Sequence, residues 1–257
     1  MLRSASAIKG YAIAASDGRL GTVSDILFDD ATWLIRWLVV DTGNWLPGRH
    51  VLLPPSVLGH LDATKKEFSV RLTMLQVENS PDIDTDRPVS RQMEPSIYDY
   101  FGWSRYWGKG FYIRGYGYLV GGLPKPPALE SRTIEEQVAA AQRSQEDRHL
   151  RSIKAVTGYQ ILGRDGDIGH VDDFLIADTD WSVHYLVADT KNWWAAKKVL
   201  ISPQPVLDIE WSDKRIKLDI DRQSVKDGPA YDGSILLGRV ARSALASAPI
   251  CDTDGAG

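Results

Sequence analysis

Polar and apolar residues alternate in two short stretches of the chain, Phe68 to Leu72 and Ile216 to Ile220. Strict alternation is typical of a β-strand with one face toward solvent, because successive side chains point to opposite faces. Two longer apolar runs, Leu34 to Val40 and Val183 to Ala188, are rich in β-branched and aromatic residues and predict central strands. The chain is therefore predicted to be mainly β.

The same pattern occurs twice along the chain, at an offset of 148 positions, since 216 − 68 = 148. At this offset roughly a third of the positions are identical without a gap, which indicates a tandem duplication. Matching pairs include Gly10-Tyr11 with Gly158-Tyr159, Asp41-Thr42 with Asp189-Thr190, and Asn44-Trp45 with Asn192-Trp193. The predicted domains are a first repeat at 2–84, an aromatic and helical extension at 85–149, a second repeat at 150–232, and a C-terminal helix and tail at 233–257.

Each repeat also carries matching turn and cap signals. Asp17-Gly18 and Asp165-Gly166 stand between apolar runs, where Asp-Gly predicts a tight hairpin. Thr73 and Asp221 stand at N-cap positions and predict a short helix that closes each repeat. Five or six short strands in about 80 residues predict a small closed barrel, because closure removes exposed strand edges.

The first motif runs Asp-Gly-x-Leu/Ile-Gly-x-Val-x-Asp-Phe/Ile-Leu from Asp17 and again from Asp165. A strand ending in Val-Val/Ala-Asp-Thr follows, and then Val-Leu-Leu/Ile-x-Pro. This pattern resembles the PRC-barrel domain, known from the cytoplasmic domain of the photosynthetic reaction centre H subunit and from the ribosome maturation factor. The resemblance implies two PRC-type β-barrels in tandem.

The chain departs from both of those proteins. It shows neither a membrane-spanning helix ahead of the barrel nor an additional N-terminal β domain, so their specific roles are not carried over. It looks more like the stand-alone tandem members of the family, some of which are linked loosely to stress responses.

Composition narrows the function classes. The hydrophobic fraction of 43%, the charged fraction of 25% and the net charge of −4 are those of an ordinary globular protein and argue against general nucleic-acid binding. The single cysteine, Cys251, predicts a fold without disulfides and a reducing compartment, with the cytoplasm as the expected location. We expect no membrane span and no secretory leader, since the first repeat starts at Leu2 and no apolar stretch approaches the required length.

The extension at 85–149 has no counterpart in the second repeat. Ser90 could cap a helix on which Met93, Ile97 and Phe101 recur at helical spacing. Large rings, arginines and glycines then interleave, and we select as candidate interaction residues Trp103, Arg105, Tyr106, Trp107, Arg114 and Tyr116.

Three interpretations of these rings remain open. Arginines beside aromatic rings could stack bases and hold phosphates, so the segment 87–125, with six Lys/Arg against two acidic residues, could bind RNA or an anionic ligand. The rings could instead pack the extension onto a barrel, which we favour because large exposed apolar patches are rare on monomers. A protein-binding surface is the next alternative.

Further candidates recur in both repeats. Asp25, Asp30 and Asp41 return as Asp173, Asp178 and Asp189, and their turn and strand-end positions favour structural roles over catalysis. The tryptophans that flank each central strand could anchor a partner or cap the barrel, and we favour the cap; they are Trp33, Trp45, Trp181 and Trp193. No catalytic residue, cofactor site or metal site is predicted, because the five histidines have no ligand spacing and no nucleophile motif occurs.

The sequence therefore favours a non-enzymatic adaptor or assembly factor built on tandem PRC-barrels. It predicts an unidentified protein partner, with a homo-oligomer as one possibility and nucleic acid as the less favoured ligand. The alternatives are RNA or anionic-ligand binding by residues 87–125 and, least favoured, an enzyme with a site between the barrels.

Overall fold

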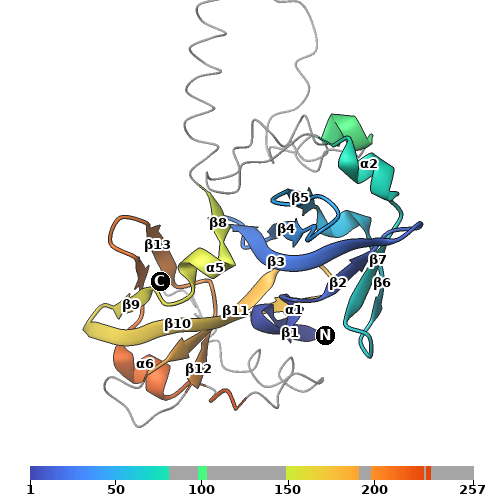
Figure 1. Ribbon diagram of the computed structural model, residues 1–257. Helices are drawn as coiled ribbons and strands as arrows, with labels where there is room; N and C mark the ends of the chain where they lie inside the picture. Colours follow the sequence, from blue (N-terminus) through green and yellow to red (C-terminus); the bar gives the residue numbers. More distant parts are fainter. Residues whose placement is uncertain (81–97, 103–148, 191–197, 229, 233–257) are drawn as a thin grey trace, which may run out of the picture. The chain divides into compact units, whose positions relative to one another are not determined.

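A computed structural model describes residues 1–80, 98–102, 149–190, 198–228 and 230–232 (Figure 1). The fold is mainly β, with two seven-stranded sheets and a few short helices. This arrangement confirms the predicted fold class of two barrel-like domains in tandem.

The first sheet is formed largely by the first repeat. Its strands follow the order β5-β4-β3-β2-β7-β6, and β8 pairs with β3 outside that path. β2 pairs parallel with β7, whereas β2 with β3 and β7 with β6 pair antiparallel. The elements are β2 (Ala12–Ala14), β3 (Arg19–Asp29), β4 (Ile35–Asp41), β5 (His50–Leu53), η1 (Pro55–Val57), β6 (Leu58–Asp62), β7 (Glu67–Val70), α2 (Met74–Glu78) and β8 (Leu150–Ser152).

The second sheet repeats this topology. Its order is β12-β11-β10-β9-β14-β13, and β1 pairs with β10 outside that path. The elements are β1 (Leu2–Ser4), α1 (Ala5–Ile8), α5 (Ile153–Val156), β9 (Gln160–Gly163), β10 (Gly166–Ala177), β11 (Val183–Asp189), β12 (Lys198–Ile201), β13 (Val206–Glu210), β14 (Arg215–Leu218) and α6 (Arg222–Lys226).

The two repeats exchange their first strands. β1, from the start of the first repeat, pairs antiparallel with β10 in the register Leu2↔Ala177 and Ser4↔Leu175. β8, from the start of the second repeat, pairs with β3 in the first sheet. The predicted domains follow the repeat boundaries, whereas each sheet in the structure contains a strand from the other repeat.

The two compact units of the chain follow this exchange of strands. Met1–Gly10 and Thr32–Ile35 belong with the chain from Ser152 onward, and we call this the second barrel unit. Tyr11–Ala31 belongs with the chain from Arg36 to Arg151, and we call this the first barrel unit. Each unit thus depends on residues that are distant in sequence.

In the first barrel unit, the central strand β4 is covered on two sides. Phe28 and Leu38 are fully buried in the interior. A second cluster contains Trp37, together with Leu27, Val39, Leu52, Tyr98 and Leu150. Burial of both faces explains why residues 35–40 form a nearly continuous apolar run rather than an alternating one.

The aromatic extension begins by packing onto this second cluster. Residues 98–101 are helical, and the Tyr98 ring lies edge-on to Trp37 with centroids 5.4 Å apart. Phe101 packs against the same cluster. In the second barrel unit Tyr231 packs in the same way on Leu175, Val187 and Leu200, the positions equivalent to Leu27, Val39 and Leu52.

Candidate functional site

The recurring aspartates hold the exchanged segments. In the second barrel unit the Asp173 carboxylate accepts hydrogen bonds from the Ser6 hydroxyl and from the Ser6 backbone N–H, the latter at 3.1 Å. Asp178 accepts from Arg3 Nε at 3.2 Å and from the N-terminal ammonium at 2.5 Å. β1 and α1 are therefore fixed to the second sheet by side chains as well as by backbone pairing.

The first barrel unit contains the equivalent contacts. Asp30 forms an ion pair with Arg151 at 2.5 Å and contacts His149 Nδ1 at 2.7 Å. Arg151 and Arg3 are equivalent in the two repeats, as are Asp30 and Asp178. Of the other recurring aspartates, Asp25 accepts from the Ile26 N–H at 2.8 Å and Asp41 accepts from the Gly43 N–H at 2.8 Å within its own turn.

Charge pairing affects the titration of Asp178. Partial burial raises the pKa of this carboxyl. Hydrogen bonds and charge attraction from the N-terminal ammonium and from Arg3 lower it by more, so the pKa lies below the ordinary value of 3.8. The folded protein therefore favours the ionised carboxylate. This is the behaviour of a carboxylate in an ion pair, whereas a general acid needs a raised pKa.

The recurring glycines have a steric role. A Cβ on Gly21 would lie 2.0 Å from the Asp41 carbonyl oxygen, and one on Gly169 would lie 2.0 Å from that of Asp189. Such contacts are impossible, so β3 and β10 can approach these turns only with glycine at both positions. A shallow cavity of about 360 Å³ beside Gly21 is lined largely by residues that recur in both repeats, which fits a scaffold feature better than a specific site.

Three of the four paired tryptophans make backbone or ring contacts within their units. Trp33 and Trp181 both have positive φ, 60° and 55°, at the turn before the central strand. The Trp33 carbonyl accepts a hydrogen bond from the Val183 N–H at 2.8 Å, and the Trp181 carbonyl accepts one from the Ile35 N–H at 2.7 Å. Trp45 donates its ring Nε1–H to the Leu20 carbonyl at 2.6 Å, and Trp193 lies outside the described residues.

The selected residues of the extension also lie outside the described part of the chain: Trp103, Arg105, Tyr106, Trp107, Arg114 and Tyr116. The residues just before them are described. Tyr100 is 43% exposed, and its hydroxyl donates to the Gln76 carbonyl in α2 at 3.1 Å. Leu75, next to Gln76, is 65% exposed. We call Leu75, Gln76 and Tyr100 the α2 surface.

Sequence reasoning did not find the α2 surface. Leu75 falls within the short helix predicted after Thr73, and Tyr100 is not among the selected candidates. Comparison of the two repeats would have pointed to this surface, because Met74-Leu75 stands where the second repeat has Arg222-Gln223. An apolar pair in one copy is replaced by a polar pair in the other.

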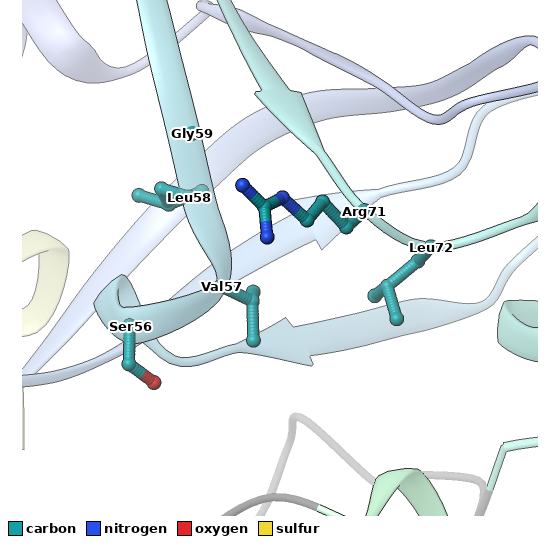
Figure 2. Close-up of a pocket in the computed structure, with 6 residues that line it drawn as sticks. All are labelled: Ser56, Val57, Leu58, Gly59, Arg71 and Leu72. Carbon is teal, nitrogen blue, oxygen red and sulfur yellow. The ribbon is translucent and has the colours of Figure 1, made fainter.

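A second cavity, of about 430 Å³, also went unnoticed in the sequence (Figure 2). It lies in the first barrel unit between η1, β6 and the end of β7, and its lining residues are Ser56, Val57, Leu58, Gly59, Arg71 and Leu72. Figure 2 shows the Arg71 side chain extending from the end of β7 toward β6. The pocket thus combines one cation with several apolar side chains.

Metal and membrane features can be judged for the described ranges alone. There, no three His, Cys, Asp or Glu side chains come together as metal ligands would. Over the same residues, no helix combines the length and the apolar character that crossing a membrane requires.

Comparison with known proteins places the first repeat. Residues 2–73 match the sequence model of the PRC-barrel domain. The match covers β1 to β7, which is the part of the first repeat that forms strands. No curated protein matches the chain. PRC-barrel domains in general suggest a role in protein interaction or assembly. The chain therefore carries a PRC-barrel domain at residues 2–73.

Proposed function

We propose that the protein is a non-enzymatic adaptor or assembly factor, and that it binds a protein partner through the α2 surface and the aromatic segment that follows residue 102. The observation that carries the proposal is the exposure of Leu75 and Tyr100, at 65% and 43%, on and beside α2 in the first barrel unit. Exposed apolar side chains cost free energy in water, and burying them against a partner recovers it.

The asymmetry between the repeats supports this choice of surface. The second repeat shares the fold but has Gln223 at the position of Leu75. Since both copies form a barrel, an exposed leucine at this position is not a requirement of the scaffold. Its presence in the first repeat therefore favours a role in binding.

The contacts of the aspartates support the non-enzymatic part of the proposal. Acid–base catalysis needs carboxyl groups that face a substrate cavity. Asp30, Asp173 and Asp178 instead bind the exchanged segments. The recurrence of Asp30 as Asp178 is explained by their equivalent contacts with Arg151 and Arg3.

Affinity capture with three versions of the full chain tests the proposal. The first is wild type, the second carries Leu75→Gln with Tyr100→Gln, and the third carries Leu207→Gln as a matched control. Leu207 is 67% exposed, close to the 65% of Leu75, but it lies on β13 in the second barrel unit. Thermal unfolding should first show that all three fold alike, because exposed substitutions rarely change stability by more than about 0.5 kcal/mol.

The proposal predicts a partner that wild type and Leu207→Gln retain and that the α2-surface variant loses by about tenfold or more, since hot-spot side chains each contribute upward of about 1 to 2 kcal/mol. Equal retention by the α2-surface variant would refute this surface. Replacing Trp103, Tyr106 and Trp107 by alanine extends the test to the aromatic segment.

A further inference from the structure

The pocket shown in Figure 2 has a chemical character of its own. Leu72 is buried, with 6% exposure, and Val57 is half-buried, so these two side chains give the pocket an apolar wall. Ser56 lies exposed in the middle of η1 and adds a hydroxyl to the lining. Gly59 carries no side chain, and a Cβ at this position would lie 2.7 Å from the Ser69 hydroxyl oxygen, so the glycine allows β6 to lie close to β7.

Arg71 supplies the charge. Its side chain is exposed, and among the described residues no carboxylate forms an ion pair with it. A guanidinium presents several N–H donors in one plane and can hold a carboxylate through two parallel hydrogen bonds. An unpaired arginine on the wall of a partly apolar cavity is therefore suited to an anionic group with an apolar attachment.

The duplication provides an internal comparison. The second repeat has Leu207 in place of Gly59 and Asp219 in place of Arg71. Asp219 is paired with Arg164 at 2.7 Å, and this pairing lowers the pKa of the Asp219 carboxyl. The charge at Asp219 is thus opposite to that at Arg71 and already has an ion-pair partner, and the exposed Leu207 stands in place of the glycine.

We propose that the pocket of the first barrel unit binds a carboxylate carried on a short apolar chain. The Arg71 guanidinium takes the carboxylate, and Val57 with Leu72 contacts the apolar chain. The carboxylate can belong to a free organic acid or to the C-terminus of a peptide, since both present the same chemistry. The site does not depend on the partner-binding role of the α2 surface.

Titration of the ¹⁵N-labelled full chain tests this site. The probes are hexanoate, 1-hexanol as its neutral counterpart, and the peptide acetyl-Ala-Ala-Leu with either a free or an amidated C-terminus. Binding is followed by the amide signals of residues 56–59 and 71–72. The protein variants are Arg71→Gln, Arg71→Asp, which copies the second repeat, and Lys9→Gln, which removes one positive charge in the other barrel unit.

The proposal predicts that hexanoate or the free peptide shifts these signals and that the hexanol and the amidated peptide bind at least about tenfold more weakly. Arg71→Gln should weaken carboxylate binding by a similar factor, Arg71→Asp should abolish it, and Lys9→Gln should leave it unchanged. A response to hexanoate indicates a free acid, and a response to the peptide alone indicates a C-terminus. The α2-surface variant should bind as wild type does, whatever its effect on partner capture.

Three results would overturn the site. They are the absence of any shift with both carboxylates, equal binding of the charged and neutral probes, and binding that survives Arg71→Gln unchanged. Because Arg71 is exposed, its replacement is not expected to unfold the protein, and the unchanged positions of the remaining signals will show that directly.

Discussion

At the scale of single residues, the recurring aspartates show what the sequence could and could not predict. Their structural role was predicted from turn propensity, and Asp41 does bind its own turn at Gly43. Asp30 and Asp178 instead bind arginines that lie in the other repeat, at Arg151 and Arg3. Local propensity reports short-range hydrogen bonds, so it contains no information about a partner more than a hundred residues away.

The Asp178 contact leads to a prediction about pH. Because the pKa of Asp178 is lowered on folding, its contribution to stability is complete above the ordinary value of 3.8 and is lost as the pH falls through the lowered value. Asp178→Asn should therefore reduce the free energy of unfolding by about 1 kcal/mol at pH 7, and by clearly less at pH 3. Urea unfolding at both pH values measures the difference.

Asp213→Asn provides the control for that experiment. Asp213 is 55% exposed and lies 4.0 Å from Arg215, so its loss should change stability little at either pH. If Asp178→Asn reduces the free energy of unfolding equally at pH 3 and pH 7, the ion pair of Asp178 with the exchanged strand does not stabilise the protein.

At the scale of elements, most strands and both closing helices were predictable. The runs at 34–40 and 183–188 became β4 and β11. Thr73 and Asp221 are the predicted N-caps, and Thr73 forms a complete capping box with Gln76. Of the helix predicted from Ser90 through Phe101, residues 98–101 are described and are helical, whereas the helix predicted in the C-terminal segment 233–257 lies outside the described residues.

Strand pairing was less predictable than strand position. β1 and β8 are three residues each, Leu-Arg-Ser in both repeats. Alternation of apolar and polar residues indicates that a segment is extended, but it does not identify the strand with which it pairs. Identical segments at equivalent places in two repeats fit either sheet by sequence alone.

The covering tyrosines give a prediction at this scale. Tyr98 is 3% exposed and fills the outer cluster of the first barrel unit. Tyr98→Ala should cost about 3 kcal/mol, because the ring contacts with Trp37 and Val39 are lost. It should also speed proteolysis around residues 98–102.

Tyr231→Ala is the matched variant in the second barrel unit, where it removes the ring that packs on Val187. It should destabilise its own unit and leave proteolysis at 98–102 unchanged. If Tyr98→Ala leaves both stability and proteolysis as in wild type, the described start of the extension does not cover the barrel.

At the scale of the whole molecule, the duplication describes the sequence better than it describes the folding units. Each barrel unit is completed by the first strand of the other repeat. What the repeats share accounts for the scaffold: the close glycines, the aspartates and the backbone exchange at Trp33 and Trp181. What they do not share, the α2 surface and the Arg71 pocket, is where the two proposals about binding are placed.

Hydrogen exchange in two single-residue variants tests the exchange of strands most directly. Proline cannot donate in a β-ladder, so Arg3→Pro removes β1 pairing and Arg151→Pro removes β8 pairing. The structure predicts that Arg3→Pro lowers amide protection in β10, residues 166–177, and that Arg151→Pro lowers it in β3, residues 19–29. The opposite assignment, with Arg3→Pro loosening β3 and Arg151→Pro loosening β10, would show that each repeat folds on itself and would contradict the account.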